Sequence, residues 1–232
     1  MRKLRYNPCM TILRVCFFVF LVGVLAAQEK AAPPTQKLIF ENEFVRVLDM
    51  HYAPGVSEAM HSHARGVTIA MSDYDNETKT ADGKVNKGHV KFGRVGWAEP
   101  VTHEAHNTGT TEQHVVRIEL KKDAPPAPGA AAVDPLDSVV ACNDTEKVLF
   151  ENAYVRAIEV HSAAGTAEPK HRHPQGVTVA MTSYDGESTG EDGKVSRNHN
   201  TKGDVRWSLP VVHQVKNVGT TEQWVVRVDI KQ

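Results

Sequence analysis

Cysteine is scarce in this chain, with three among 232 residues. Cys9 and Cys16 lie in the N-terminal segment that we assign below to a signal peptide, which leaves Cys142 as the one cysteine of the mature chain. An intramolecular disulfide is then excluded, so the fold must be stable through packing even in a compartment that permits disulfides. We expect Cys142 to be an unreactive thiol in a linker, and the alternative is a disulfide between two chains.

The sequence also has no excess of basic charge. There are 27 Lys and Arg residues against 28 Asp and Glu, a formal net charge of −1. Nucleic-acid binding driven by phosphate contacts needs a basic surface, so we predict no nucleic-acid partner. Hydrophobic residues make up 41% and charged residues 24%, which is typical of globular proteins and excludes a disordered, collagen-like or coiled-coil chain. The length predicts one or two domains.

Long apolar runs are absent except near the N-terminus. Residues 15–27 form an uncharged run of 13 residues after a basic segment, residues 2–14. A membrane-spanning helix needs about 20 apolar residues, whereas the core of a signal peptide is shorter. We therefore predict a signal peptide over residues 1–27, a periplasmic or secreted protein, and no stable membrane anchor after cleavage. The alternative is an uncleaved anchor.

The remainder of the chain is an internal duplication. Residues 37–122 align with residues 147–232 at a constant offset of 110, without a gap and with 41 identities in 86 positions. A repeat of this length is a whole domain rather than a solenoid unit. Residues 123–146 between the copies are rich in Pro, Ala and Gly and predict a linker, and residues 28–36 predict a shorter tether.

Each copy has the pattern of an all-β domain. Apolar and polar or small residues alternate over residues 67–71 and 116–120, which is typical of half-buried strands. Asp82-Gly83 and Asp192-Gly193 are turn dipeptides between such segments. Apolar residues do not follow a helical spacing over three turns in any segment. Several short strands in about 86 residues predict a small barrel or sandwich.

Histidine is the abundant functional residue, with twelve in the chain. Ten of them form five pairs at the offset of 110, namely 51/161, 61/171, 63/173, 89/199 and 103/213. His61 and His63 are two residues apart, so on a strand both side chains leave from the same face. Two imidazoles on one face can share a metal ion. His103 can complete the site from another strand.

These histidines stand in two motifs that resemble those of the cupin superfamily. The first motif, Gly-x5-His-x-His, occurs at residues 55–63 and again at residues 165–173. The second, Pro-x2-His-x3-Asn-x-Gly, occurs at residues 100–109 and 210–219. Both motifs occur in order in both copies. The resemblance implies two tandem cupin-type, jelly-roll-like β-barrels, cupin domain 1 at residues 37–122 and cupin domain 2 at residues 147–232.

The resemblance also implies divalent metal sites, with one departure from the family pattern. The implied ligands are His61, His63 and His103 in one copy and His171, His173 and His213 in the other. Cupins place a Glu four or five residues after the second motif histidine, where this chain has Val67 and Thr68, and Val177 and Thr178. Similarity to three-histidine cupins, which include thiol and diketone dioxygenases, survives this loss. Three neutral imidazoles favour Zn, Fe(II), Cu or Ni over Mn or Mg. The alternative is a metal-free polar barrel mouth.

Several polar pairs leave more than one interpretation open. Glu58 and Glu168, three residues before the first motif histidine, are candidate acid/base groups or replacement carboxylates, although solvated loop carboxylates are favoured. His51 and His161 share a strand face with an acidic residue and can orient a ligand, but an exposed strand face is favoured. Arg117 and Arg227 can bind a substrate carboxylate or pair with acids. The remaining paired positions are interpreted as surface histidines, 89 and 199, and core tryptophans, 97 and 207.

The sequence therefore predicts an exported two-domain cupin that binds a divalent metal and acts on a small molecule in a dioxygenase-, hydrolase- or isomerase-like reaction. The alternative is a non-catalytic periplasmic protein that binds or senses a metal or small ligand. No residue identifies a catalytic group. The expected partners are a small-molecule ligand, the other barrel of the same chain, and a second copy in a homo-oligomer. We expect the second copy to be the tighter metal site.

Overall fold

The structure, a computed structural model, describes residues 33–123 and 133–231. The predicted signal peptide at residues 1–27 lies outside the described residues, as do residues 28–32 of the tether and 124–132 of the linker. Within the described ranges, no helix is long and apolar enough to cross a membrane.

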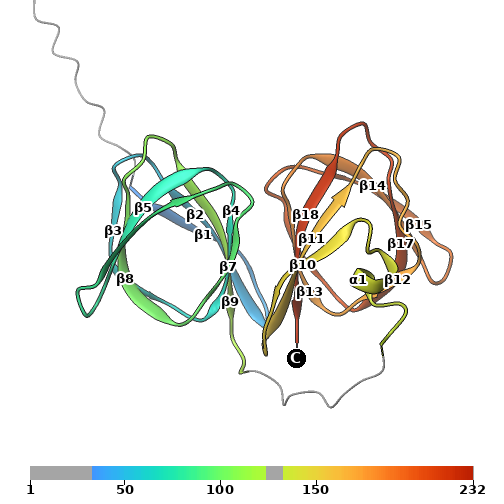
Figure 1. Cartoon of the computed structure of the whole chain (residues 1–232), viewed down its shortest axis with the longest axis horizontal. Helices are drawn as coiled ribbons and strands as arrows, with labels where there is room; N and C mark the ends of the chain where they lie inside the picture. Colours follow the sequence, from blue (N-terminus) through green and yellow to red (C-terminus); the bar gives the residue numbers. More distant parts are fainter. Residues whose placement is uncertain (1–32, 124–132, 232) are drawn as a thin grey trace, which may run out of the picture. The chain divides into compact units, whose positions relative to one another are not determined.

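The first copy folds into a barrel of two antiparallel sheets (Figure 1). One sheet has the strand order β1-β2-β9-β4-β7 and the other β3-β8-β5-β6. The strands are β1 (Thr35–Glu41), β2 (Val45–Tyr52), β3 (Ser57–His63), β4 (Gly66–Ala70), β5 (Tyr74–Thr80), β6 (Val85–Val90), β7 (Val95–Ala98), β8 (Val101–Asn107) and β9 (Gln113–Leu120).

The second copy repeats this topology. Its sheets have the orders β10-β11-β18-β13-β16 and β12-β17-β14-β15. The strands are β10 (Glu146–Glu151), β11 (Val155–Ser162), β12 (His171–His173), β13 (Gly176–Ala180), β14 (Tyr184–Gly190), β15 (Val195–Asn200), β16 (Val205–Ser208), β17 (Val211–Asn217) and β18 (Gln223–Ile230). The predicted all-β class with two tandem barrels is confirmed.

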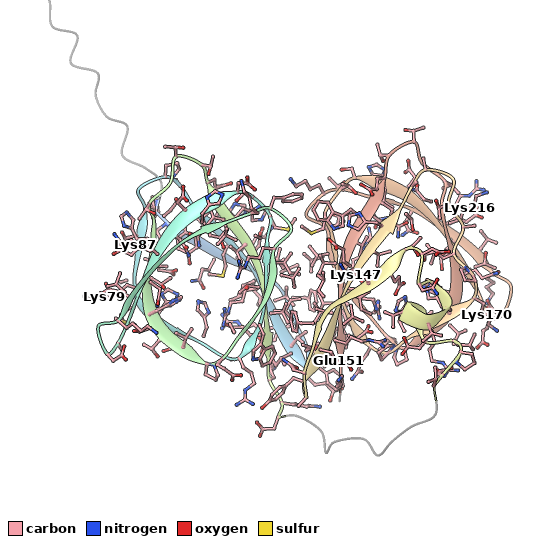
Figure 2. All side chains as sticks on the ribbon, in the orientation of Figure 1. Lys79, Lys87, Lys147, Glu151, Lys170 and Lys216 are labelled. Atoms are coloured by element: carbon pink, nitrogen blue, oxygen red, sulfur yellow. The ribbon has the colours of Figure 1, made fainter. Side chains whose placement is uncertain are left out.

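Strand alternation divides each barrel wall into two faces. On β2, Val45 and Val47 join one hydrophobic cluster, while Leu48, Met50 and Tyr52 join a separate cluster with β5 and β8 residues inside the barrel. The charged side chains labelled in Figure 2 on strands β5, β6 and β17, Lys79, Lys87 and Lys216, project outward. The period-two pattern in the sequence therefore reports which side chains reach the barrel interior.

The outer apolar face is common to both copies. One core cluster contains Val47 and Val67 of the first barrel together with Val177 and Val228 of the second. Trp97 packs against this cluster, and its ring stacks on that of Tyr154 with centroids 5.3 Å apart. Burying the two faces on each other removes apolar surface from water.

A short helix occurs in the segment that we assign to the linker. Helix α1 (Ser138–Ala141) is capped by Asp137, whose side chain accepts a hydrogen bond from the Val139 amide. Nη1 of Arg156 also donates to both oxygens of the Asp137 carboxylate, at 3.0 Å to Oδ1 and 2.8 Å to Oδ2. These contacts hold the segment against the second barrel and place Cys142, directly after the helix, in its buried interior.

Candidate metal centres

The first histidine triad lies on two paired strands. His61 and His63 are on β3, and the neighbouring strand β8 places His103 opposite His61. The ring centroid of His61 is 4.7 Å from that of His63 and 4.8 Å from that of His103. Each residue offers a ring nitrogen within 4.8 Å of the others. The structure thus brings together the three histidines implied by the motifs.

The hydrogen bonds of the His61 and His63 rings determine which nitrogen of each ring faces the centre of the triad. Nδ1 of His61 donates to the Ala59 carbonyl at 2.8 Å, and Nδ1 of His63 donates to Oε1 of Glu119 at 2.7 Å. We assign the protons to these nitrogens because both partners are acceptors. The two Nε2 atoms then carry lone pairs, and they lie 3.0 Å apart. Two facing lone pairs repel unless a cation lies beside both.

The second triad has the same arrangement and deeper burial. His171 and His173 are on β12, and β17 places His213 opposite His171. The ring centroid of His171 is 4.8 Å from that of His173 and 4.7 Å from that of His213. Among the described residues, Nε2 of His171, Nδ1 of His173 and Nε2 of His213 are buried without a hydrogen-bond partner. Such orphaned nitrogens are costly in the absence of a ligand.

Burial keeps several of these imidazoles neutral. The pKa of His103 is lowered to about 4, chiefly by burial and then by the neighbouring His61 and His63. Burial and the adjacent His171 lower the pKa of His213 to about 4 as well. The pKa of His173 falls further below its ordinary value, again mainly through burial. A neutral imidazole is the form that binds metal, so at neutral pH protons do not compete for these nitrogens.

The carboxylates before each triad are not solvated loop groups, and that favoured interpretation is wrong. Oε2 of Glu58 lies 3.4 Å from Nε2 of His61, and its two oxygens accept bonds from the Tyr52 hydroxyl and from Nε2 of Gln36 at 2.7 Å. Glu168 is buried and accepts from the Ser162 hydroxyl at 2.8 Å. The bulge in β3 between Glu58 and His61 turns the first carboxylate toward the triad.

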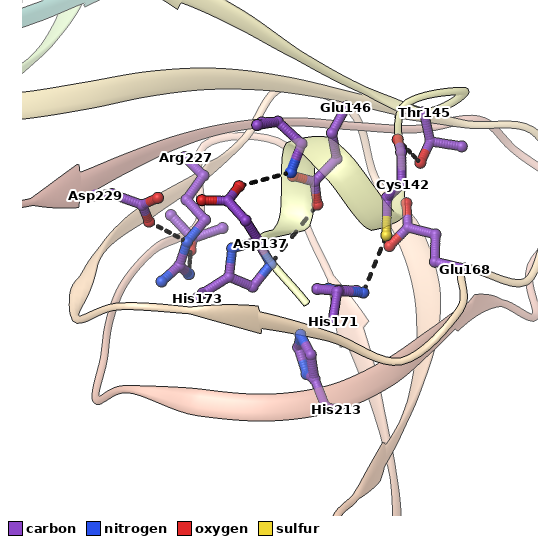
Figure 3. A network of polar contacts seen from close by, with 12 residues as sticks. Asp137, Cys142, Thr145, Glu146, Glu168, His171, His173, His213, Arg227 and Asp229 are labelled. Carbon is purple, nitrogen blue, oxygen red and sulfur yellow. Dashed lines mark hydrogen bonds and ion pairs between the residues drawn. The ribbon is translucent and has the colours of Figure 1, made fainter. Parts of the chain in front are cut away.

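Two residues that the sequence did not assign to a metal site, Cys142 and Glu146, also reach the second triad (Figure 3). Sγ of Cys142 is 3.1 Å from Nδ1 of His171, and Oε1 of Glu146 is 3.6 Å from Nε2 of His173. Burial raises the pKa of the Cys142 thiol to about 12 and that of Glu146 to about 7. Cys142 therefore lies in the interior of the second barrel against a triad histidine and not in a linker, while its raised pKa agrees with the expected unreactive thiol.

The buried arginines of the interior are held by protein groups. Nε of Arg227 donates to Oδ1 of Asp229 at 2.7 Å, and its Nη2 donates to the Pro174 carbonyl at 2.6 Å. Arg117 donates in the same way to Glu119 and to the Ala64 carbonyl. These contacts favour acid pairing, the alternative to substrate binding that the sequence left open.

Other histidines form a separate cluster or lie at the surface. Nε2 of His114 is 2.7 Å from Oδ1 of Asp49, and His51 stacks on the His114 ring with centroids 4.0 Å apart. This cluster is half-buried and lies apart from the triads. His89 and His199 are exposed and pair with aspartates on a neighbouring strand, as expected of surface histidines.

A small cavity adjoins each triad. The first, of about 190 Å³, is lined by His63 and His103 together with Arg117. The second, of about 160 Å³, is lined by His173 and His213, and by both Glu146 and Glu168. Each has room for a small molecule and exposes two of the three triad histidines to it.

The residues of both triads fit a divalent transition ion. Zn–nitrogen bonds of about 2.0–2.1 Å place two ligand nitrogens about 3.4 Å apart at the tetrahedral angle and about 2.9 Å apart at a right angle. The Nε2 atoms of His61 and His63, 3.0 Å apart, are thus at a separation that one bound ion can bridge. In the second triad the unpartnered Nε2 atoms of His171 and His213 provide equivalent donors. Imidazole suits Zn, Cu, Fe and Ni.

Comparisons with known proteins identify the fold. No family model matches the chain, and no curated protein matches it. Among solved structures, AerE from Microcystis aeruginosa superposes with a TM-score of 0.59 at 12% identity, covering 86% of this chain and 98% of that one. Oxalate decarboxylase from Lactobacillus farciminis gives 0.57 at 13% identity, covering 88% and 83%. Salicylate 1,2-dioxygenase from Pseudoaminobacter salicylatoxidans gives 0.53 at 10% identity, covering 81% and 71%. At these identities the likeness shows a cupin fold and no more.

Proposed function

We propose that the chain is an exported two-domain cupin that binds one divalent transition ion in each histidine triad. The observation that carries the proposal is the pair of Nε2 atoms of His61 and His63, both directed away from their Nδ1 partners and 3.0 Å apart. The buried, unpartnered Nε2 atoms of His171 and His213 support the same conclusion for the second barrel.

The proposed activity is metal-dependent chemistry on a small molecule in the adjoining cavity. A bound ion supplies Lewis acidity and open coordination positions. The chain supplies three imidazoles at each site, an adjoining cavity and, in the second barrel, the carboxylates of Glu146 and Glu168 on the cavity wall. Two of the structural neighbours, oxalate decarboxylase and salicylate 1,2-dioxygenase, are named for enzymes of small acids, which supports this class of substrate.

A specific observation also favours a purely binding role for the first barrel. Its cavity is lined by no Asp or Glu among the residues that the structure describes, so no carboxylate on its wall faces a ligand as Glu146 and Glu168 do in the second cavity. We therefore propose metal-dependent chemistry for the second barrel and metal or small-ligand binding for the first.

Elemental analysis of the purified chain tests the metal sites. We expect up to two ions per chain after loading with Zn or Fe(II). His61→Ala combined with His63→Ala should remove one ion and leave the other, since the two sites take their ligands from separate barrels. A loaded protein without stoichiometric metal would contradict the proposal. Oxygen uptake with a panel of small carboxylic acids then distinguishes turnover from binding.

Export is proposed from the sequence pattern of residues 1–27, a basic segment followed by 13 uncharged residues. N-terminal sequencing of the protein from the periplasm or medium should begin near residue 28. A soluble cytoplasmic pool that keeps its initiator methionine would contradict export.

A further inference from the structure

We propose that the two barrels hold chemically different metal sites, because Glu146 is a fourth protein ligand in the second barrel and has no counterpart in the first. This inference rests on the proposed metal binding at the two triads. It assigns a carboxylate ligand to a position outside both histidine motifs, on the first strand of the second barrel.

The repeat offset identifies the residue that stands in the place of Glu146 in the first barrel. Glu146 pairs with Val160 across β10 and β11, and Gln36 pairs with Met50 across β1 and β2. Each lies 110 residues from its equivalent, so the same backbone position carries a carboxylate in one barrel and an amide in the other. Gln36 donates its Nε2 to Glu58 at 2.7 Å and is exposed.

The Glu146 carboxylate is buried and incompletely hydrogen-bonded, as expected of a metal ligand in the absence of its ion. The residue is 5% exposed, and its Oε2 has no hydrogen-bond partner among the described residues. Its Oε1 is 3.6 Å from Nε2 of His173 (Figure 3). A buried carboxylate oxygen without a donor is costly, and a cation held by the three imidazoles would satisfy it.

The two cavities also differ in whether a carboxylate lines them. Glu146 lines the cavity of the second barrel beside His173 and His213. Glu58, whose Oε2 lies 3.4 Å from Nε2 of His61, does not line the first cavity, and its oxygens already accept bonds from Tyr52 and Gln36. Glu58 therefore remains a neighbour of His61 and is not free to bind an ion.

A carboxylate ligand changes which ion the second site prefers. Three imidazoles alone leave the +2 charge uncompensated, whereas a carboxylate neutralises part of it. Carboxylate ligands suit Mn(II) better than imidazole alone does. We expect both barrels to bind Zn(II) and only the second to bind Mn(II) tightly.

The test compares Glu146→Gln with the unchanged chain, because glutamine is the residue of the first barrel at this position. Mn(II) binding is measured by electron paramagnetic resonance of free Mn(II) and by equilibrium dialysis with elemental analysis. We expect Glu146→Gln to weaken Mn(II) binding at least about tenfold, the low end of the loss seen when a partner of a metal site is removed. Zn(II) stoichiometry should stay unchanged.

Two controls keep the assignment falsifiable. Glu58→Gln alters the carboxylate beside His61 in the first barrel and should leave Mn(II) binding intact. Glu146→Asp retains a carboxylate, and partial recovery of Mn(II) binding would separate the charge from a folding defect. Equal Mn(II) affinity in the unchanged chain and Glu146→Gln would overturn the role of Glu146. Binding of no ion at all by the unchanged chain would instead overturn the proposed metal function.

An alternative position for the ion in the second barrel would use Cys142 as a ligand. Cys142, Glu146, Glu168 and His171 also offer ligand atoms within 4.8 Å of one another, with Sγ of Cys142 beside Nδ1 of His171. That nitrogen donates to the Pro169 carbonyl at 2.8 Å, which favours the Nε2 side for the ion. Co(II) loaded into the chain should show no thiolate charge-transfer absorption. Such a band, abolished by Cys142→Ser, would overturn the assignment of Glu146 to the three-histidine site.

Discussion

Nδ1 of His63 lies 2.7 Å from Oε1 of Glu119, and the corresponding residues of the second barrel, His173 and Asp229, make no such bond within the part of the chain that the structure describes. Asp229 is one carbon shorter and is held by Arg227 at 2.7 Å and Arg156 at 3.1 Å. The first barrel thus orients a triad histidine with a carboxylate, and the second uses the same position for an ion-pair network.

Glu119→Gln should weaken metal binding in the first barrel only. A carboxylate on the second nitrogen of a ligating histidine fixes its tautomer and raises its basicity, and its loss typically costs about 10–100-fold in metal affinity. Calorimetric titration with Zn(II) should show one weakened and one unchanged site. Asp229→Asn is the matched control: it should reduce stability through Arg156 and Arg227 and change Zn(II) affinity less. An unchanged first site in Glu119→Gln would contradict the positioning role.

The strand pattern and the pairing of His61 with His63 were predictable from the sequence, because both depend only on residues that are close together in the chain. Alternation defines the inner face, and the spacing of His61 and His63 places both rings on it. The position of His103 opposite His61 depends on strand pairing, which only the family resemblance supplied. Glu146 and Cys142 were missed because they precede the second motif in a segment with a linker-like composition. The one available sign was the missing motif glutamate, which leaves a fourth ligand position to be filled from elsewhere.

Asn107→Ala should destabilise the protein while leaving the metal ligands in place. Asn107 is fully buried, donates to the Tyr52 and Thr111 carbonyls at 2.8 Å each, and accepts from the Gly109 amide at 3.0 Å. The motif asparagine therefore acts on the backbone. Loss of three buried hydrogen bonds should lower the free energy of unfolding by about 2–4 kcal/mol, measured by urea denaturation. Asn86→Ala, on exposed strand β6, should change it little, and equal effects of the two substitutions would refute this role.

The metal-free protein should lose stability on acidification from about pH 6.5 to about pH 4. The pKa of His103 is lowered to about 4 by burial and by the neighbouring histidines, while in the unfolded chain it is about 6.5. Between these values the unfolded state binds more protons, so the free energy of unfolding falls as the pH falls, by at most about 1.4 kcal/mol per pH unit for each such histidine. His213 contributes with the same sign. Urea denaturation across this range should show a shallower slope for His103→Gln than for the unchanged chain, and identical slopes would argue against a depressed pKa.

Glu146→Gln should make the metal-free protein more stable at alkaline pH and less responsive to metal. Burial raises the pKa of Glu146 from 4.5 to about 7. Between these values the folded state binds more protons than the unfolded state, so this residue lowers the free energy of unfolding as the pH rises from about 4.5 to about 7.

Above pH 7 the buried carboxylate is charged, and the cost of its burial is fully present. Glutamine has the same shape without the charge, so at pH 8 the metal-free variant should be more stable by about 1–3 kcal/mol, with no gain near pH 4.5. Saturating metal should reverse the order, because an ion bound only by the folded state adds stability in proportion to the logarithm of its concentration over its Kd, and the variant binds it more weakly. Melting curves at pH 4.5 and pH 8, with and without Mn(II), measure both effects. A variant less stable than the unchanged chain at pH 8 without metal would show that Glu146 is satisfied by the protein alone.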